Sequence, residues 1–256
     1  FEREGATAVV TMNRPEAKNA LSLPMLVGMA DAWAEIDSDD SIRCAVLTGA
    51  GGTFCSGMDL KSMSGPDAEK YGHRTKEDPD LHWKALLRHY QLRKPLVAAV
   101  EGWAVAGGTE ILQATDIRVA GEGAKFGVFE ARRGLFPLGG STVRLRRQIP
   151  FTMAMDLLLT AREVSAEEAL RIGLIGRVVP DGKALEEALE VADVICANGP
   201  LAVEAIKRSV RETEGLPESE ALKAELEIGM PIFATADAAE GQKAFAEKRT
   251  PEYKRR

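Results

Sequence analysis

The chain has 256 residues, of which 45% are hydrophobic and 28% charged, so it is long and apolar enough to bury a sizeable core. Its net charge of -6 supplies no basic surface for a nucleic-acid backbone, and the sequence therefore predicts no nucleic-acid partner. No stretch approaches the roughly 18 consecutive apolar residues of a membrane-spanning helix, so we also expect no association with a membrane.

The cysteines and histidines bear on compartment and metal binding. Three cysteines are present, at Cys44, Cys55 and Cys196. Their odd number and irregular spacing fit neither a disulfide framework nor a zinc knuckle, which favours a reducing compartment and a cytoplasmic location. His82 and His89 lie seven residues apart, but no acid or cysteine completes a ligand spacing around them, so the sequence predicts no metal site.

The first two thirds of the chain alternate between strand and helix patterns. Short β-branched runs over residues 7–13 and 42–49 end in turn residues and predict two strands, with apolar residues at helical spacing over 21–37 between them. A nearly continuous apolar run over 94–102 predicts a strand buried on both faces, and 117–121 predicts another. This alternation predicts the α/β class.

Residues 61–84 carry the weakest pattern, with glycine, proline and mixed charges. They separate the second and third predicted strands. Their composition predicts a surface excursion over whatever site the body of the protein carries.

Helical patterns dominate the last third of the chain. The segment 165–173 opens with Ser165 and Glu168 in capping-box positions and has Gly173 at its end. Further amphipathic helices are predicted over residues 183–200, 200–215, 217–230 and 237–253. We therefore expect the chain to end in an all-helical tail.

Two glycine-containing turns are candidate binding sites for a developing negative charge. In "GWAVAGGTEI" a buried strand ends near Glu101 and a helix is expected to begin near Gly107, where backbone amides have no partner within the helix. A second turn, from Ser56 to Met58, lies in "GTFCSGMDL". Amides from both turns that converge on one carbonyl oxygen would make an oxyanion hole. Taken alone, each turn fits a tight strand-to-helix connection at least as well.

Two glutamates accompany these turns. Glu110 falls in the first turn of the helix that begins near Gly107, where the helix dipole favours an acid for stability alone. Glu130 lies in "AKFGVFEARRGLFPLGG", between aromatic and glycine-rich segments. Each glutamate by itself is more typical of a solvated or ion-paired side chain than of a catalyst, so only the combination of amides and acids points to chemistry.

Four segments together resemble the enoyl-CoA hydratase/isomerase, or crotonase, superfamily: "FCSGMDL", "KPLVAAVEGWAVAGGTEIL", "DIRVAGEGAKFGVFEARRGLFPLGG" and "EEALRIGLIGRVVP". The resemblance covers essentially the whole chain, from "VVTMNRPEAKNALS" to "AFAEKRTPEY". It implies an α/β fold in which ββα units wind into a spiral over residues 1–190. A helical C-terminal region over residues 191–256 would drive assembly into trimers or hexamers. The implied substrate is an acyl-CoA thioester, with no metal and no redox cofactor.

The resemblance assigns catalytic roles to four residues. The backbone N–H groups of Met58 and Gly107 correspond to the oxyanion hole, and Glu110 and Glu130 correspond to two glutamates that grip one water in the hydratases of the family. The implied activity is that of an enoyl-CoA hydratase, a lyase that adds water in syn fashion to a trans-2-enoyl-CoA in fatty-acid β-oxidation-type metabolism. Glu110 would act as general base on the water, and Glu130 would supply the proton to C2.

Further positions correspond to the substrate-binding path of the family. The residues implied in substrate binding are Lys18, Ala20, Ser56, Gly57, Asp59, Leu60, Gly108, Leu135, Pro137 and Lys248. Leu135 and Pro137 would form a wall at the acyl end, whereas Lys248 would meet the phosphates of a ligand bound to a neighbouring subunit. Lys18 and Lys248 fit ordinary surface lysines equally well.

Two departures from the family pattern leave the exact substrate open. Ala106 replaces the first of three successive glycines, and Phe129 stands where a proline often precedes the second acid, so the acyl pocket is expected to differ. "EARRGL" and "FAEKR" also resemble carnitinyl-CoA dehydratases. A Δ3-Δ2 enoyl-CoA isomerase and a non-catalytic acyl-CoA-binding or RNA-binding paralogue are further alternatives. The two glutamates and the negative net charge argue against them.

Overall fold

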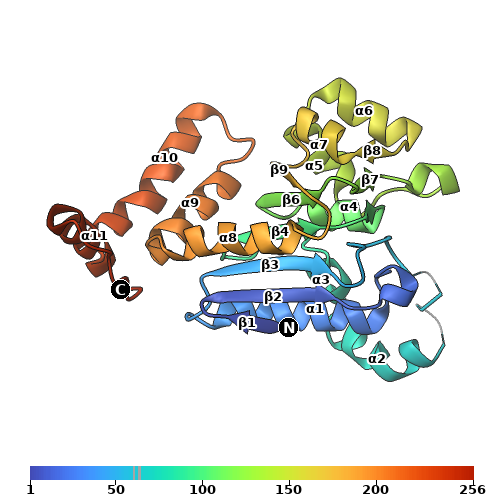
Figure 1. Cartoon of the computed structure of the whole chain (residues 1–256), viewed down its shortest axis with the longest axis horizontal. Helices are drawn as coiled ribbons and strands as arrows, with labels where there is room; N and C mark the ends of the chain where they lie inside the picture. Colours follow the sequence, from blue (N-terminus) through green and yellow to red (C-terminus); the bar gives the residue numbers. More distant parts are fainter. Residues whose placement is uncertain (60, 63–64) are drawn as a thin grey trace.

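The computed structural model describes residues 1–59, 61–62 and 65–256, and this part of the chain forms a mixed α/β fold built on two sheets (Figure 1). The larger sheet has six strands in the order β1-β2-β3-β4-β6-β9. They are β1 (Glu2–Glu4), β2 (Thr7–Met12), β3 (Cys44–Gly49), β4 (Leu96–Val100), β6 (Ile117–Gly121) and β9 (Arg177–Val179). All pairs are parallel except that of β1 with β2. The four strands predicted in this region are β2, β3, β4 and β6, which confirms the α/β class.

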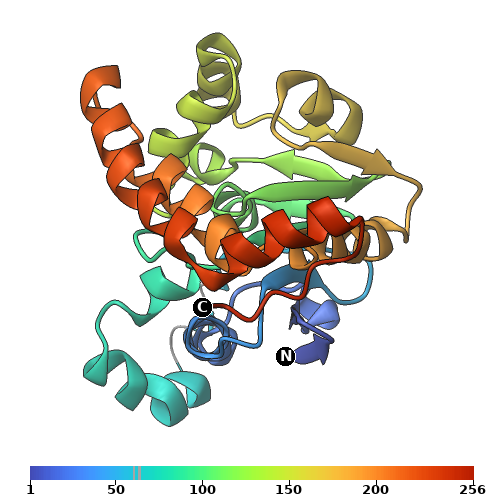
Figure 2. The same cartoon turned by 90° about the vertical axis from the view of Figure 1, so that its left-hand side faces the viewer.

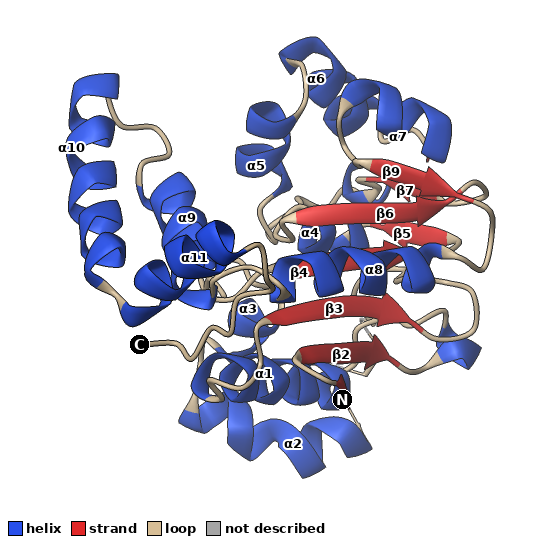
Figure 3. Cartoon of the chain, turned by 60° about the vertical axis from the view of Figure 1, so that its left-hand side comes forward, coloured by secondary structure: helices blue, strands red, loops and turns tan. Residues whose placement is uncertain are grey.

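The central strands of the larger sheet are buried on both faces. Alternate residues of β3 and β4 point to opposite sides, as the period of a strand requires. One side packs on α8 (Ala184–Cys196), whose inward face consists of three alanines and a valine, and these small side chains let the helix lie close to the sheet (Figure 3). The other side packs on α1 (Leu23–Ser38), where the buried Trp33 donates its Nε1–H to the Ala85 carbonyl oxygen at 3.0 Å.

The smaller sheet has the order β5-β7-β8 and consists of β5 (Trp103–Val105), β7 (Lys125–Gly127) and β8 (Val164–Ser165). β4 and β5 are followed by α4 (Gly107–Leu112), and β6 and β7 by the short helix η2 (Glu130–Arg133). Each of these two strand–strand–helix units places its first strand in the larger sheet and its second strand in the smaller sheet. The units therefore wind as a spiral. The strands of the smaller sheet are not predicted from the sequence because each has at most three residues and so carries little periodicity.

The surface excursion expected over residues 61–84 has regular structure in much of the part that the structure describes. Two helices, α2 (Pro66–Glu77) and α3 (Leu81–Ala85), occupy most of it. Pro66 at the first position, acids in the first turn and bases in the last turn all favour α2. This helix buries none of its residues, so it has no apolar stripe that sequence analysis could detect.

The segment after η2 is helical around one short strand. Its helices are α5 (Ser141–Gln148), α6 (Phe151–Thr160) and α7 (Ala166–Ile172). As predicted, α7 begins after Ser165, whose Oγ accepts the Glu168 N–H at 3.2 Å, and it ends at Gly173 in the left-handed conformation. A capping box also requires the Glu168 side chain to accept the backbone N–H of Ser165, and this half of the prediction is wrong. The Glu168 carboxylate instead binds Arg162 through bonds of 2.7 and 2.8 Å, because a bidentate charged pair is stronger than one bond to a backbone amide.

The C-terminal helices form an arm that projects from the sheets, as Figure 1 and Figure 2 show from two sides. They are α9 (Pro200–Glu212), α10 (Glu218–Gly229), the short helix η3 (Met230–Ala234) and α11 (Ala236–Glu247), and they confirm the helices predicted there. The predicted domain boundary after residue 190 stays a prediction, and it falls inside α8. Among the helices of the described residues, none is both long and apolar enough to cross a membrane.

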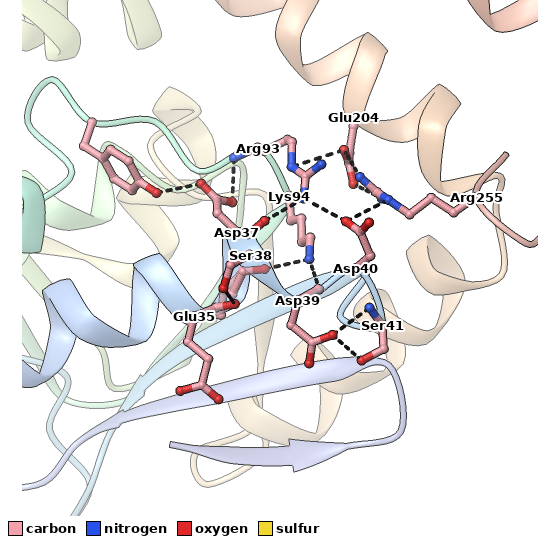
Figure 4. Close-up of polar contacts among 12 residues, drawn as sticks. Glu35, Asp37, Ser38, Asp39, Asp40, Ser41, Arg93, Lys94, Glu204 and Arg255 are labelled. Atoms are coloured by element: carbon pink, nitrogen blue, oxygen red, sulfur yellow. Dashed lines mark hydrogen bonds and ion pairs between the residues drawn. The ribbon is translucent and has the colours of Figure 1, made fainter.

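An ion-pair network fastens the arm to the core (Figure 4). Arg255, near the end of the chain, binds the carboxylate of Glu204 on α9 at 2.9 Å and that of Asp40, just after α1, also at 2.9 Å. Arg93 reaches the same two carboxylates at 3.5 and 3.0 Å. The neighbouring Lys94 is fully buried and donates its Nζ to two carbonyl oxygens near the end of α1. The end of α1, the segment before β4 and the arm therefore form one connected cluster.

Candidate active site

The segment around Met58 is held by backbone hydrogen bonds on both sides. On one side Cys55 pairs with β5 through bonds of 2.8 and 3.0 Å. On the other side the Leu21 N–H donates to the Gly57 carbonyl oxygen at 2.8 Å, and the Asp59 N–H donates to the Leu21 carbonyl oxygen at 3.1 Å. Because successive residues of an extended backbone present their polar groups to opposite sides, the Met58 N–H points away from Leu21.

Gly107 begins α4 and lies directly against this segment. A Cβ atom placed on Gly107 would lie 3.5 Å from the Cα of Gly57 and 3.6 Å from the backbone nitrogen of Met58. In the part of the chain that the structure describes, neither the Met58 N–H nor the Gly107 N–H donates to a protein acceptor. Two unpartnered amides side by side, one of them at a helix start, can bind a negatively charged oxygen. The structure thus brings together the two turns that the sequence singled out.

This close approach depends on missing side chains. Gly57 has a φ of +98°, which favours glycine, and a Cβ atom on Gly108 would lie only 2.4 Å from the Cys55 carbonyl oxygen. Ala106 has a φ of +51° and a ψ of -124°, a conformation that residues with a side chain rarely adopt. The strained residue therefore stands where the family pattern has the first of its three glycines.

Glu110 lies one turn after Gly107 and is buried, with 5% of its surface exposed. The turn before α5 surrounds its carboxylate. The Ser141 N–H donates to Oε1 at 3.3 Å, and the backbone of Gly139 lies directly against the carboxylate. A Cβ atom on Gly139 would lie 2.5 Å from Oε2, so this turn has room only for glycine. Burial raises the pKa of Glu110, and the hydrogen bonds oppose that rise.

Glu130 comes three residues after β7, whose end is fixed to the start of α4. The Gly127 carbonyl oxygen accepts hydrogen bonds from the Ala106 N–H at 2.8 Å and from the Thr109 hydroxyl at 2.9 Å. These bonds join the two elements at the positions that lead into the two acids. Glu130 and Glu110 consequently lie close enough for the charge of one to act on the other.

The two carboxyl groups have contrasting environments. Burial, and then the charge of Glu110, raise the pKa of Glu130 to about 7, while Arg133 has an opposing effect. The Oε2 atom of Glu130 is buried and has no hydrogen-bond partner among the described residues, whereas the Glu110 carboxylate accepts the Ser141 N–H. The contrast favours an ionised Glu110 and a protonated Glu130 near neutral pH, which is the arrangement of a base beside an acid.

The ring of Phe129 folds back on β7. A Cβ atom on Gly127 would lie 2.1 Å from the ring, so the ring occupies the space that this glycine leaves. The guanidinium of Arg132 lies over the ring at 4.5 Å from its centre. Phe129 is thus held between a strand backbone and a cation, and its expected effect on the acyl pocket stays a prediction.

The predicted substrate path begins in the loop before α1. The Ser56 N–H donates to the Lys18 carbonyl oxygen at 3.1 Å, which joins this loop to the Met58 segment. Arg14 links the same two parts by binding the Ala20 carbonyl oxygen at 2.9 Å and the Asp59 carboxylate at 3.0 Å. The predicted residues that the structure brings together here are Lys18, Ala20, Ser56, Gly57, Asp59 and Gly108.

The other predicted substrate residues are placed differently. Leu135 and Pro137 lie between η2 and α5, in the stretch that leads into the turn around Glu110, and Leu135 is half exposed. Lys248 caps α11, which lies far from α4 in Figure 1, so it does not meet the site of its own chain. Its contact with a ligand of a neighbouring subunit stays a prediction. Leu60 lies outside the described residues.

Several residues that shape the site are missing from the sequence analysis. Asn19 is fully buried, with a φ of +52°. Its side chain accepts the Arg14 N–H at 2.8 Å and donates to the carbonyl oxygens of Ala50 and Thr53 at 2.8 and 2.5 Å, which orders the loop before α1. Ser141 and the two glycines before it were also missed. Their signal is "LGGS", a glycine pair directly before a helix.

Comparisons with known proteins show which family the chain resembles along its whole length. The family profile described as enoyl-CoA hydratase/isomerase matches residues 2–256. The protein named "Enoyl-CoA hydratase EchA19" from Mycobacterium tuberculosis is 58% identical, over 100% of this chain and 96% of that protein. The "Short-chain-enoyl-CoA hydratase" from Clostridium acetobutylicum is 38% identical, over 97% of this chain and 94% of that protein. A crystal structure of enoyl-CoA hydratase from Mycobacterium tuberculosis H37Rv has a TM-score of 0.91 at 39% identity, with 100% of this chain and 98% of that chain covered. The chain therefore belongs to the enoyl-CoA hydratase/isomerase family and has the fold of the crotonase superfamily.

Proposed function

We propose that this protein is an enoyl-CoA hydratase, a lyase that adds water to a trans-2-enoyl-CoA thioester and gives the 3-hydroxyacyl-CoA in fatty-acid β-oxidation-type metabolism. The observation that carries the proposal is the convergence of two unpartnered amides with two buried carboxyl groups, one bonded to a backbone N–H and the other with a pKa raised to about 7. The amides belong to Met58 and Gly107, and the carboxyl groups to Glu110 and Glu130. Relatives named as enoyl-CoA hydratases that match nearly the whole chain support the same activity.

The mechanism follows from these four groups. The amides of Met58 and Gly107 bind the thioester oxygen and stabilise the negative charge that collects on it when C3 is attacked, and each such donor is worth about 10² to 10³ in kcat. The ionised Glu110 takes a proton from the attacking water, while the protonated Glu130 delivers a proton to C2. Because both groups grip one water, its oxygen and a proton reach the same face of the double bond, which gives syn addition.

The remaining predicted roles are part of the same proposal. Addition of water transfers no electrons, and an acid, a base and two amides supply each step, so we expect no metal and no redox cofactor. The loop residues around Lys18 and Ser56 would follow the coenzyme A part of the substrate, with Leu135 and Pro137 at the acyl end. Three unpaired cysteines support a cytoplasmic location.

The test is an assay with crotonyl-CoA, with carnitinyl-CoA and a 3-enoyl-CoA as comparison substrates. We expect crotonyl-CoA to gain the mass of one water molecule and to be the best substrate of the three. Preferred loss of water from carnitinyl-CoA would identify a carnitinyl-CoA dehydratase instead, and double-bond migration without a change of mass would identify an isomerase. Turnover of none of them would leave a non-catalytic binding protein.

The pH dependence of kcat/KM for hydration is expected to follow the protonation of Glu130. This residue donates a proton only while it is protonated, and its pKa is raised to about 7, so kcat/KM should fall as the pH rises through about 7. Replacing Arg133 by alanine removes a positive charge that lowers this pKa, and the fall should move to higher pH. Measuring kcat/KM from about pH 5 to 9 checks both effects. Arg146→Ala, at an exposed position on α5, is the matched control, and an equal profile for both variants would contradict the assignment.

We propose that the arm mediates assembly into a homotrimer, or into a hexamer of two trimers. Its large exposed apolar side chains are Ile206, Val210, Leu222, Leu226, Met230, Phe233 and Phe245. The space between α9 and α10 is a mostly apolar groove of about 460 Å³. Soluble proteins rarely leave so much contiguous apolar surface in water, and a second copy of the chain is the partner that we propose for it.

Charged substitutions in this groove are expected to disrupt the assembly. Leu226 and Phe233 are 61% and 74% exposed in the single chain, so aspartate at both positions should leave the fold intact but place two charges in the interface. Light scattering should then report the mass of one chain, whereas Lys223→Ala, an exposed polar position on the same helix, should keep the mass of the wild type. A wild-type protein that is monomeric would contradict the proposal.

A further inference from the structure

Two arginines bind the turn that lies against the Glu110 carboxylate, directly before α5. Arg88, in the segment after α3, donates its Nε–H to the Leu138 carbonyl oxygen at 2.7 Å. Arg144, on α5 itself, donates from Nη1 to the Gly139 carbonyl oxygen at 3.4 Å. Guanidinium groups therefore bind both of the peptide groups that flank the Cα atom of Gly139.

The turn has little to fix its own shape. Gly139 and Gly140 have no side chains, and Gly140 has a φ of +123°, so their backbone is freer than that of other residues. In a planar trans peptide group the C=O and the N–H point to opposite sides, so a bond to the oxygen also fixes the direction of the N–H. A Cβ atom on Gly139 would lie 2.5 Å from Oε2 of Glu110, and the Ser141 N–H donates to Oε1 at 3.3 Å. A shift of the turn therefore moves groups that touch the carboxylate.

Both arginines are anchored outside the turn. The Nη2 of Arg144 donates to the carbonyl oxygens of Leu87 and Arg88 at 2.5 and 2.7 Å. The guanidinium of Arg88 lies over the ring of Trp83 at 5.0 Å from its centre. Among the described residues both guanidinium groups donate to carbonyl oxygens, whereas Arg147 on the same helix forms an ion pair. The two arginines thus tie the segment after α3 to the turn.

We propose that Arg88 and Arg144 form a clamp on the turn before α5, and that they are positioning residues which hold the Glu110 carboxylate ready to accept a proton from water. The inference rests on the proposed role of Glu110 as the base. Burial lowers the pKa of Arg144 to about 10, so this residue stays charged in an assay from about pH 5 to 9. Glu130 from η2 also acts at this site, with Arg133 acting on it, and the variants below leave both in place.

Two variants of Arg88 isolate its hydrogen bond to the turn. Arg88→Met removes every N–H of the side chain, whereas Arg88→Gln places an amide nitrogen the same number of bonds from the backbone as the Nε of arginine. Both variants lose the positive charge and its contact with the Trp83 ring. Arg88→Met should lower kcat by about tenfold, and Arg88→Gln should stay within about twofold of the wild type, because only glutamine can still donate to the Leu138 carbonyl oxygen.

The pH profile shows whether the effect passes through the base. A displaced turn weakens the Ser141 N–H bond that favours the ionised Glu110, so the pKa of Glu110 should rise. In Arg88→Met the acidic limb of the kcat/KM profile should then move to higher pH by about half a unit, whereas Arg88→Gln should keep the wild-type limb. KM should change by less than about twofold in both, because Arg88 lies outside the proposed substrate path.

Arg144→Met should have a larger effect, because three carbonyl oxygens lose their donor. We expect kcat to fall by about 10²-fold and the acidic limb to move up by about one unit. Arg147→Met removes a cation from the next turn of α5 and is the matched control, which should keep the wild-type rate and profile. Arg144→Met also removes a positive charge that interacts with Glu110, so the two Arg88 variants, which lose the same charge, decide between charge and position.

The outcomes distinguish the clamp from the proposed function. A wild-type protein that does not hydrate crotonyl-CoA would overturn the function itself. If the wild type does hydrate it, equal rates and equal acidic limbs for Arg88→Met and Arg88→Gln would overturn the clamp and leave the function standing. Wild-type behaviour of Arg144→Met would do the same. Arg88 is exposed, so its variants should fold, as circular dichroism would show, even if Arg144→Met does not.

Discussion

Replacing Glu110 by glutamine is expected to lower kcat for hydration of crotonyl-CoA by about 10³-fold, within the range of about 10² to 10⁴ for a positioned base. Glutamine has the size of glutamate, and its carbonyl oxygen still accepts hydrogen bonds from the turn at Gly139 to Ser141. The turn and the substrate site should therefore keep their shape, and KM should change little. What the variant loses is the ability to take a proton from water. Initial rates at saturating substrate measure the effect.

Glu130→Gln is expected to give a loss of similar size for a different reason, since an amide cannot deliver the proton to C2. It should also abolish the fall in rate above about pH 7 that the wild type shows, because the group that titrates there is gone. The double variant should be little worse than either single variant, because the two residues act on one water.

The matched control for both variants is Glu122→Gln, an exposed glutamate in the turn between β6 and β7. It should retain the wild-type rate. Near-wild-type hydration by both Glu110→Gln and Glu130→Gln would contradict the assignment of the acid and the base while leaving the fold and the family intact.

Gly108→Ala, which adds one methyl group, is expected to lower kcat by about 10² to 10³ while leaving both glutamates unchanged. The new Cβ atom would lie 2.4 Å from the Cys55 carbonyl oxygen, a backbone atom that cannot rotate out of the way. The segment that carries Met58 must then move relative to α4, and the two amides no longer converge on one oxygen. The same overpacking should lower the free energy of unfolding by about 1–3 kcal/mol.

The control for Gly108→Ala is Gly28→Ala, the same substitution in the middle of α1. A Cβ atom at Gly28 meets nothing within 4 Å, so this variant should raise the free energy of unfolding by about 0.5–1 kcal/mol and leave kcat unchanged. Urea unfolding and initial rates on both variants give the comparison. Wild-type turnover by Gly108→Ala would show that the two amides do not act together.

The elements that the sequence predicts correctly have strong local signals. β4 is a continuous apolar run because both of its faces are buried, and α7 has its own cap at Ser165 and its own stop at Gly173. The elements that the sequence does not predict have no strong local signal. α2 buries no residue, and the strands of the smaller sheet are too short to show alternation, so only their pairing with distant strands makes them regular.

The residues of the candidate site also divide into those that have a local signal in the sequence and those that have none. The amide-bearing turns can be identified from glycines that precede expected helices, and the two acids from their place beside these turns and from the family resemblance. Gln113, whose side chain binds Ser141, has no such signal, because a glutamine at the end of a short helix is ordinary in sequence. Its partner Ser141 lies 28 residues away along the chain and meets it only in the folded protein.

The sequence by itself therefore determined the α/β class, most of the helices and long strands, and the residues that carry the chemistry. The tertiary structure alone decided that the Met58 and Gly107 amides converge, since Leu21 and β5 hold them in place from different parts of the chain. It also decided that Glu110 accepts a hydrogen bond from the turn before α5 and that the pKa of Glu130 is raised to about 7. The physical reason is that helix and strand preferences act between near neighbours, whereas burial, amide direction and proton affinity depend on groups that only folding brings into contact.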